Sequence, residues 1–310
     1  MKIAFVFPGQ GSQVVGMLKG FDGHPAVRAT LDEASQVLGE DLWQLVTHGP
    51  EEALDLTVNT QPVMLAAGVG VWRAWQAAGG PQPAMLAGHS LGEYAALVAS
   101  GALAFADAVP LVRFRAQAMQ EAVPPGAGAM AAILGADEDM VLAACRKAAE
   151  GHVVEPVNFN APAQVVIAGE RAAVERAMQA AKELGARRAV LLPVSAPFHS
   201  SLLRPAAERL AQRLAQVPFT TPSIPVVHNV DVAVHPEPDA IRAALAAQAA
   251  SPVRWTQTVQ TFAAAGVTHV VECGPGKVLA NLVKRIDDKL EALALTSGSM
   301  LDDALAQLRG

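Results

Sequence analysis

The sequence is poor in cysteine and in charge. Only two of its 310 residues are cysteines, Cys145 and Cys273, which are too few for a disulfide framework or a four-cysteine zinc site. We expect both to be small buried hydrophobes in a reducing compartment. Charged residues make up 17% of the chain, and 23 basic against 29 acidic residues give a formal net charge of −6. The overall basic footprint of a nucleic-acid-binding protein is therefore missing.

Long hydrophobic runs are missing as well. The apolar segment Ile3–Phe7 ends at Pro8, far short of the core of a signal peptide. The longest apolar stretch, Ala95–Val112, is interrupted by Asp107 and Pro110, whereas a membrane span needs about 20 apolar residues. We therefore expect no membrane anchor and a cytoplasmic location.

Hydrophobic residues are abundant, at 52% of the chain. A disordered chain would not carry enough apolar surface to offset the entropy lost on ordering, so the composition predicts a folded protein with a large core. At about 150 residues per domain, the length favours about two domains, or one large domain that is subdivided.

Short apolar runs alternate with helical periodicity in the outer parts of the chain. Buried strands are expected at Ile3–Phe7, Ala84–Ala87, Pro225–Asn229 and His269–Cys273. Helices are expected at Pro25–Leu38, Thr60–Ala78, Leu202–Gln216, Ala240–Ala250 and Thr256–Ala265, and after the glycine motifs at 88–92 and 274–276. This alternation predicts an α/β fold with a mostly parallel sheet and helices on both faces.

The middle of the chain has a different order, β-α-β-β-α-β, which is that of a ferredoxin-like α+β unit. Strands are expected at Ala129–Leu134, Val153–Phe159, Val165–Ala168 and Ala189–Val194, with helices at Glu138–Ala149 and Arg171–Leu184. Proline-containing segments flank this unit. We interpret residues 125–196 as a small ferredoxin-like subdomain inserted into a large hydrolase-like α/β subdomain formed by residues 1–124 and 197–310.

The segment Gly88-His89-Ser90-Leu91-Gly92 matches the G-x-S-x-G pattern of a nucleophile elbow. It lies between a predicted strand and a predicted helix, the context in which a serine hydroxyl projects from a sharp turn. The helix behind it would direct backbone N–H groups toward developing negative charge. The same residues would also suit a serine that merely caps a helix.

A serine nucleophile needs a base, usually histidine, and the chain has eight histidines. His89 adjoins the serine but is expected to point to the opposite side of the elbow. His199 lies in a proline-containing loop at the predicted junction of the two subdomains, which makes it a reasonable candidate. Spacing alone leaves the choice of base open.

Four motifs occur in a fixed order along the chain. They are Phe7-Pro8-Gly9-Gln10-Gly11-Ser12-Gln13, Gly88-His89-Ser90-Leu91-Gly92-Glu93-Tyr94, Asn158-Phe159-Asn160-Ala161-Pro162 with Gln164, and Glu272-Cys273-Gly274-Pro275-Gly276. Together they closely resemble the malonyl-coenzyme A:acyl carrier protein transacylases of bacterial fatty-acid synthesis. The resemblance extends from the first strand to about Lys284, and that family also has a small ferredoxin-like subdomain.

The resemblance implies roles for the serine, its base and the oxyanion hole. Ser90 would be acylated and His199 would be the base. A backbone carbonyl near Gln248, in place of a carboxylate, would orient the histidine. The N–H groups of Gln10 and Leu91 would form the oxyanion hole, although Gly9-Gln10-Gly11 taken alone predicts only a tight turn.

The resemblance also implies how an acyl group is selected. Arg115, on the helix after the elbow helix, would bind the free carboxylate of a malonyl group, because a guanidinium binds carboxylates bidentately. Arg113, two positions earlier, would then be the solvated one. A lone helical arginine is otherwise more often a surface residue. Phe198 stands where related stand-alone enzymes often have a small residue, and its ring would leave less room for an α-methyl branch.

The function implied is an acyl-carrier-protein S-malonyltransferase. It would move malonyl from malonyl-CoA to the phosphopantetheine thiol of acyl carrier protein through malonyl-serine, in a ping-pong cycle. The CoA thioester would be a substrate, so no cofactor is expected. No metal, nucleic acid or membrane partner is expected either, and the enzyme is expected to be a monomer. Alternatives are a related malonyl transferase serving a polyketide synthase or malonate decarboxylase carrier, and a serine esterase.

Overall fold

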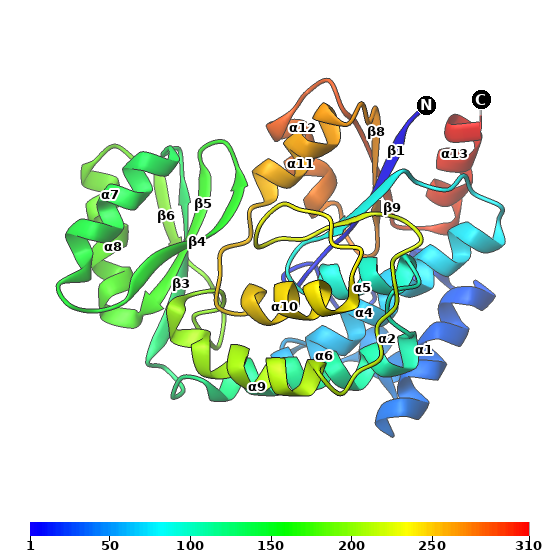
Figure 1. Ribbon diagram of the computed structural model, residues 1–310, viewed down its shortest axis with the longest axis horizontal. Helices are drawn as coiled ribbons and strands as arrows, with labels where there is room; N and C mark the ends of the chain where they lie inside the picture. Colours follow the sequence, from blue (N-terminus) through cyan, green and yellow to red (C-terminus); the bar gives the residue numbers. More distant parts are fainter. Residues whose placement is uncertain (310) are drawn as a thin grey trace.

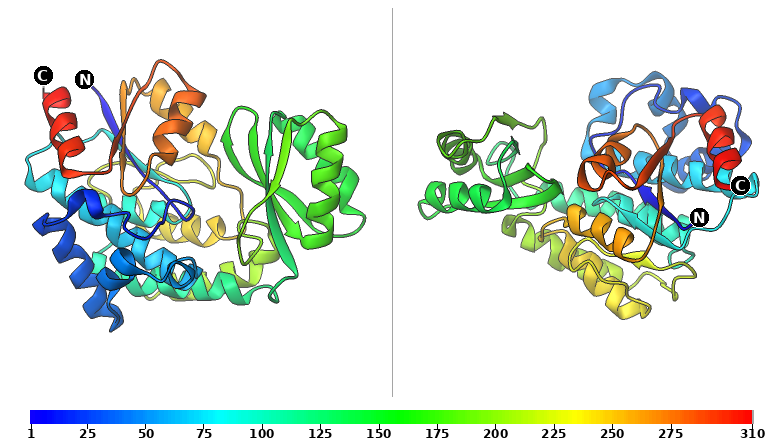
Figure 2. Two further views of the ribbon diagram at one scale, coloured as in Figure 1. Left: turned by 180° about the vertical axis from the view of Figure 1, so that it is seen from behind. Right: turned by 90° about the horizontal axis from the view of Figure 1, so that it is seen from above.

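The computed structural model describes residues 1–309, and two separate sheets organise this part of the chain (Figure 1). One sheet is parallel and flanked by helices, and the other is small and antiparallel. The predicted fold class, a parallel α/β sheet with an added ferredoxin-like unit, is confirmed. Figure 2 shows the small unit to one side of the large one, with both chain ends on the large unit.

The parallel sheet has the strand order β7-β2-β1-β8-β9, and every pairing in it is parallel. Its strands are β1 (Ile3–Phe7), β2 (Met85–Gly88), β7 (Val226–Val227), β8 (His269–Cys273) and β9 (Glu291–Leu295). All residues of β1 and β8 are buried, as expected of strands covered on both faces. β1 lies at the centre, so the loop that follows it emerges in the middle of the sheet edge.

Helices cover both faces of the parallel sheet. Alternate residues of β1 separate the two cores: Phe5 and Phe7 pack into a large cluster with α4, whereas Ala4 and Val6 pack into a second cluster with α11 and α12. The helices of this unit are α1 (Pro25–Leu38), α2 (Leu42–His48), α3 (Glu51–Leu54), α4 (Thr57–Ala77), α5 (Gly92–Ala99), α6 (Phe105–Glu121), α9 (Arg204–Leu214), α10 (Pro238–Gln248), α11 (Trp255–Ala264), α12 (Val278–Ile286) and α13 (Gly298–Arg309), with short 3-10 turns η1 (Lys19–Phe21) and η2 (Ser201–Leu203).

The small sheet has the order β4-β5-β3-β6, which is the strand order of a ferredoxin-like unit. It consists of β3 (Gly128–Leu134), α7 (Glu138–Ala149), β4 (Val154–Ala161), β5 (Gln164–Glu170), α8 (Arg171–Glu183) and β6 (Arg188–Leu191). Its helices share a core of their own with one face of the sheet. The other face contributes Met130, Val157 and Val166 to the core of the large unit, so the two units are packed together.

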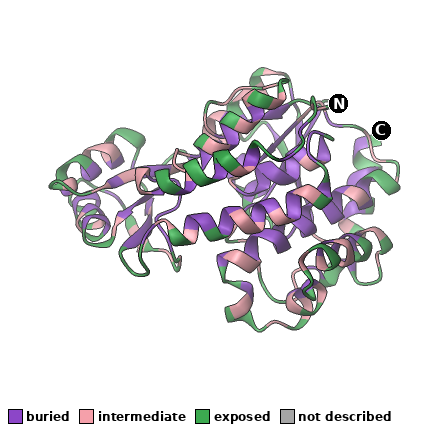
Figure 3. Cartoon of the chain, turned by 60° about the horizontal axis from the view of Figure 1, so that its bottom comes forward, coloured by how far each residue is buried: buried purple, intermediate pink, exposed green. Residues whose placement is uncertain are grey.

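Some elements differ from the sequence-based expectation. The strand predicted at Pro225–Asn229 is reduced to Val226–Val227, because the backbone N–H groups of His228 and Asn229 donate to Ala233 and Glu93 and not to a neighbouring strand. β9 was not predicted, because Glu, Ala and Leu favour helices and only pairing with β8 makes this segment a strand. Burial follows the layers, with exposed residues on the outer helix faces (Figure 3). Within residues 1–309, no helix is long and apolar enough to span a membrane.

Candidate active site

Ser90 lies on a sharp turn between β2 and α5, with a φ of 52° that is unusual for a residue other than glycine. The flanking glycines make this turn possible. A Cβ atom on Gly88 would lie 1.9 Å from the carbonyl carbon of Gly92, and one on Gly92 would lie 2.0 Å from the carbonyl oxygen of Phe7. Any larger residue at either position would push the elbow away from the sheet, so the pattern G-x-S-x-G is a packing requirement in this fold.

The hydroxyl of Ser90 contacts a histidine that follows the small unit in the chain. Ser90 Oγ lies 2.7 Å from Nε2 of His199, and Nδ1 of His199 lies 2.8 Å from the backbone carbonyl oxygen of Gln248. A carbonyl only accepts, so Nδ1 carries the proton and Nε2 presents its lone pair to the serine. This arrangement suits a Ser–His dyad whose histidine is oriented by a carbonyl, without a carboxylate.

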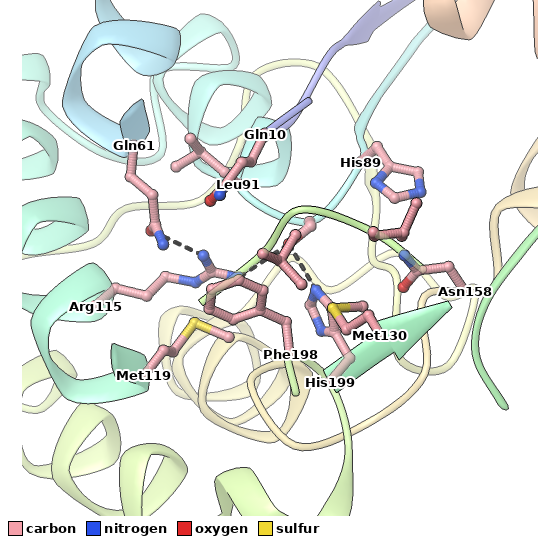
Figure 4. Close-up of a pocket in the computed structure, with 13 residues that line it drawn as sticks. Gln10, Gln61, His89, Leu91, Arg115, Met119, Met130, Asn158, Phe198 and His199 are labelled. Carbon is pink, nitrogen blue, oxygen red and sulfur yellow. Dashed lines mark hydrogen bonds between the residues drawn. The ribbon is translucent and has the colours of Figure 1, made fainter. Parts of the chain in front are cut away.

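Two backbone amides lie next to this dyad. Leu91 begins the turn into α5, and Gln10 lies in the loop after β1, which is brought close because Phe7 of β1 pairs with Gly88 of β2. Figure 4 shows Gln10 and Leu91 side by side. Within residues 1–309, neither amide nitrogen has a hydrogen-bond acceptor. Both are therefore available to an oxyanion.

Arg115 of α6 lies at the base of the site and is only 2% exposed. Its Nη1 donates to Oε1 of Gln61 at 2.8 Å, and its Nη2 donates to Oε1 of Gln248 at 2.9 Å and to Ser90 Oγ at 3.1 Å. Both glutamines are neutral, and no carboxylate within residues 1–309 pairs with this guanidinium. A buried cation that has no direct ion pair and lies beside the nucleophile is suited to an anionic acyl group.

Arg113 differs from the expectation that it would be solvated. Its guanidinium donates two hydrogen bonds to the carboxylate of Glu40, at 2.8 and 2.6 Å, and its side chain is only 17% exposed. The helix places it on another face from Arg115, because residues two positions apart on a helix do not share a face. It has no contact with the site.

A small cavity of about 110 Å³ adjoins the dyad, and its walls are mostly apolar. Phe198, Met119, Met130, Leu192 and Val194 line it, and Figure 4 labels the first three of these. Phe198 is 9% exposed. Residues of both units contribute to this lining, so the cavity lies where the two units meet.

His89 lies at this same cavity, not on the far side of the elbow as expected. Its Nε2 is 2.8 Å from Oδ1 of Asn160 and its ring packs against Trp255, at 5.5 Å between centroids. These contacts hold the ring away from Ser90 and leave His199 as the histidine in contact with the nucleophile.

A family model described as an acyl transferase domain matches residues 4–298, nearly the whole chain. The chain belongs to the acyl transferase family.

Individual members of the acyl transferase family show how close the similarity is. The malonyl CoA-acyl carrier protein transacylase of Escherichia coli K12 is 56% identical over 305 residues, covering 98% of this chain and 99% of that protein. The crystal structure of the acyl-carrier-protein S-malonyltransferase from Burkholderia pseudomallei 1710b is 62% identical and covers 99% of this chain and 100% of its own, with a TM-score of 0.97. The resemblance inferred from the four motifs is confirmed.

A second acyl transferase structure includes a partner. It is that of a malonyl-transacylase in complex with a type II polyketide synthase acyl-carrier protein, with 51% identity and a TM-score of 0.98, covering 99% of this chain and 100% of that chain.

A buried polar network beneath the elbow was not predicted from the sequence. Glu93 of α5 is 0% exposed, and its carboxylate accepts from His228 Nδ1 at 2.7 Å, from the backbone N–H of Asn229 at 2.9 Å and from Gln248 Nε2 at 2.9 Å. Burial lowers the pKa of His228, but the charge and hydrogen bond of Glu93 outweigh it, so the pKa is raised overall. Glu93 is the acid closest in sequence to the nucleophile, yet it faces away from His199.

The same network holds the elbow itself. Asn229 Oδ1 accepts from the backbone N–H of Ser90 at 2.7 Å, and Asn229 Nδ2 donates to the carbonyl of Gly88 at 2.7 Å. Gln248 Nε2 donates to the carbonyl of Ser90 at 3.0 Å. The strained turn is therefore held by side chains on both sides. The only local signal for these contacts was the polar pair His228-Asn229 at the end of a predicted strand.

We expect Glu93→Ala to destabilise this acyl transferase by about 3–5 kcal/mol, because it leaves the donors of His228, Asn229 and Gln248 buried without an acceptor. The measurement is urea unfolding followed by circular dichroism. As a control, Glu121→Ala removes the exposed partner of Arg209 and should cost less than about 1 kcal/mol. Equal midpoints for the two variants would show that the buried network does not support the fold.

Proposed function

We propose that this protein transfers the malonyl group of malonyl-CoA to the phosphopantetheine thiol of acyl carrier protein, in fatty-acid biosynthesis. The observation that carries the proposal is the guanidinium of Arg115, which is buried, has no salt-bridge partner within residues 1–309 and lies 3.1 Å from Oγ of the nucleophile Ser90. In a malonyl ester the carboxylate is separated from the ester carbonyl by one methylene group. A cation this close to the serine is therefore within reach of the carboxylate of a short acyl chain attached to it.

In the first half-reaction, His199 Nε2 removes the proton of Ser90 as Oγ attacks the thioester carbonyl. The resulting oxyanion accepts hydrogen bonds from the backbone N–H groups of Gln10 and Leu91. Collapse of this intermediate breaks the carbon–sulfur bond, and protonated His199 returns its proton to the sulfur of the leaving coenzyme A. The product is malonyl-Ser90. The carbonyl of Gln248 accepts from Nδ1–H throughout and stabilises the imidazolium that forms.

In the second half-reaction, the phosphopantetheine thiol gives its proton to His199 as the sulfur attacks the ester carbon of malonyl-Ser90. The same two amides hold the oxyanion, the carbon–oxygen bond breaks, and the proton passes from His199 to Ser90. The free serine and the malonyl thioester of the carrier result, which completes a ping-pong cycle.

Burial and the nearby charge of Arg115 lower the pKa of His199 from 6.5 to about 3. His199 acts as a base only when its ring is neutral, and the ring becomes protonated only as the pH falls toward this pKa. We therefore expect the acylation rate to show no loss from protonation of His199 between about pH 8 and about pH 5. The measurement is single-turnover acylation with malonyl-N-acetylcysteamine, which has no titrating phosphate. A tenfold fall in rate across this range, with an inflection near 6.5, would contradict this environment for His199.

Phe198 and Arg115 would together decide which acyl group is accepted. Arg115 discriminates against acetyl, because a neutral group would leave the cation buried and unpaired. The ring of Phe198 narrows the cavity beside the dyad, so we propose that it disfavours the α-methyl branch of methylmalonyl.

The identity of the acceptor is supported by relatives. The Escherichia coli and Burkholderia pseudomallei proteins are named for an acyl carrier protein, whereas a further relative is bound to a polyketide synthase carrier. A carrier of either kind presents the same phosphopantetheine thiol, so polyketide or malonate decarboxylase carriers remain alternative acceptors. An esterase is a weaker candidate, because Arg115 has no use in simple ester hydrolysis. We further propose a cytoplasmic, monomeric enzyme that needs no metal or cofactor.

One assay tests the proposal. The purified protein is incubated with holo acyl carrier protein and malonyl-, methylmalonyl- or acetyl-CoA, and carrier products are measured by mass spectrometry beside a hydrolysis control without carrier. We expect malonyl transfer to exceed hydrolysis and to exceed transfer of the other groups. Hydrolysis faster than transfer would favour the esterase, and comparable acetyl transfer would contradict the role of Arg115.

A further inference from the structure

The loop that supplies one oxyanion donor is only lightly packed beyond Gln10. Gly9 lies tightly against the elbow, since a Cβ on it would be 2.5 Å from the carbonyl oxygen of His89. Gly11 is exposed, and no atom lies within 4 Å of the position of its missing Cβ; the same is true of Gly16. Tight packing therefore fixes the loop before Gln10. After Gln10 the loop is held by side-chain hydrogen bonds, from the Gly11 N–H to Gln13 Oε1 at 2.6 Å and from Gln13 Nε2 to Asp55 Oδ1 at 2.9 Å.

The side chain of Gln10 has a hydrogen bond of its own. Thr57, the first residue of α4, donates from Oγ1 to Oε1 of Gln10 at 2.8 Å, and the same Oγ1 accepts from Nε2 of Gln61 at 3.2 Å. Gln61 Oε1 in turn accepts from Arg115 Nη1 at 2.8 Å. An unbroken chain of hydrogen bonds thus runs from the buried cation to the oxyanion loop.

The direction of each bond in this chain is determined by chemistry. A guanidinium only donates, so the oxygen of the Gln61 amide must face Arg115, and its NH₂ group must face Thr57. The hydroxyl of Thr57 accepts that bond, which leaves its own hydrogen free to donate to Gln10. Thr57 and Gln61 are each only 2% exposed, so water does not compete for these groups.

The hydroxyl of Thr57 donates no hydrogen bond to the backbone around its own helix, and its one partner within α4 is the side chain of Gln61. Thr60, one turn later and fully buried, behaves as buried helical threonines usually do and donates to the backbone carbonyls of Leu54 and Leu56, at 2.6 and 3.1 Å. Thr57 makes no such bond, and the helix has no side-chain cap at its start. Its hydroxyl serves the contact with Gln10 and Gln61.

We infer that Thr57 is a positioning residue for the reaction: it holds the side chain of Gln10 so that the backbone N–H of Gln10 stays directed at the oxyanion, and it ties this loop to Arg115. The inference rests on the proposed function, because it assigns Thr57 a part in the same oxyanion hole. Both half-reactions use that hole, so a loosened donor slows the whole cycle with little effect on substrate binding.

The test compares Thr57→Val, Thr57→Ser and Gln10→Ala. Thr57→Val keeps the shape of the side chain but removes its hydroxyl. Gln10→Ala removes the side-chain acceptor of that hydroxyl but keeps the backbone N–H of residue 10. We expect each to lower kcat for malonyl transfer about 10-fold, which is less than loss of a whole donor, with KM within about twofold. Acetyl transfer should fall by the same factor, because all thioesters need the oxyanion hole. Thr57→Ser should restore kcat to within about twofold.

The double variant Thr57→Val/Gln10→Ala shows whether the two residues act through one contact. If they do, kcat falls no further than in either single variant; a loss of about 100-fold would mean independent effects and would overturn the inference. Thr60→Val is the matched control, since it removes a buried threonine hydroxyl from the same helix and should leave kcat unchanged. Should Thr57→Val fail to fold, Gln10→Ala alone decides, because Gln10 lies in a partly exposed loop.

Two further outcomes separate this inference from the proposed function. A wild-type protein that transfers no malonyl would overturn the proposed function itself. An active wild-type protein with unchanged kcat in Thr57→Val or Gln10→Ala would overturn only the role of Thr57. A fall restricted to malonyl, with acetyl transfer unchanged, would assign Thr57 to carboxylate binding through Gln61 and would also overturn the inference.

Discussion

Replacing Ser90 with alanine is expected to abolish the covalent intermediate and to lower malonyl transfer by about 10⁶-fold, to the level of the uncatalysed reaction in the same cavity. The acyl group is carried on Oγ, and within residues 1–309 Ser90 is the residue whose hydroxyl is hydrogen-bonded to His199 Nε2, at 2.7 Å. Intact mass spectrometry after mixing with malonyl-CoA should show the added malonyl mass on the wild type and none on the variant.

Ser100→Ala is a matched control for this experiment. Ser100 is buried and lies at the end of helix α5, which follows Ser90, and its hydroxyl donates to the carbonyl of Leu97. This variant should still become malonylated. Accumulation of malonyl-enzyme in Ser90→Ala would show that another residue carries the acyl group, and the proposed mechanism would be wrong.

Replacing Arg115 with alanine is expected to lower kcat/KM for malonyl-CoA by about 10³-fold while leaving acetyl transfer unchanged or slightly raised. Removing one partner of a buried charge pair leaves the other charge desolvated and unpaired, which costs about 2–5 kcal/mol. In the variant that unpaired charge is the malonyl carboxylate. Acetyl carries no charge and meets no such cost. The two rates are measured with the same carrier, as a ratio.

Arg113→Ala provides the control, because Arg113 lies two residues earlier on α6 and pairs with Glu40 outside the site. It should leave both rates within about twofold, as expected of a partly exposed ion pair. An equal fall in malonyl and acetyl transfer in Arg115→Ala would mean that Arg115 only supports Gln61 and Gln248. Selectivity would then have to arise elsewhere in the cavity.

Local sequence was sufficient for most of the fold. The runs at Ile3–Phe7 and His269–Cys273 predicted strands with the observed bounds, because a fully buried strand is a short apolar run ended by Pro-Gly or Gly-Pro. The helix predicted at Glu138–Ala149 was also confirmed with the same bounds. β9 was missed because Glu, Ala and Leu have helical preferences, and only pairing with β8 overrides them.

The nucleophile was also recognisable locally. The two glycines around Ser90 are required by contacts within the elbow and with the neighbouring strand. The G-x-S-x-G spacing is therefore a direct consequence of the geometry of this turn. The base, in contrast, could not be recognised from local sequence. His199 is 109 residues from Ser90 in sequence, and only the resemblance to a known family selected it among eight histidines.

By itself, the sequence determined the alternation of layers, the inserted ferredoxin-like unit and the elbow serine, because these depend on periodicity and on turn chemistry over a few residues. Only the tertiary structure decided that Glu93 contacts His228, 135 residues away, and that Thr57 lies between Gln61 and Gln10. The reason is physical. A hydrogen bond between distant side chains depends on where the backbone carries them, and neither its partner nor its direction leaves a pattern in the spacing of residues along the chain.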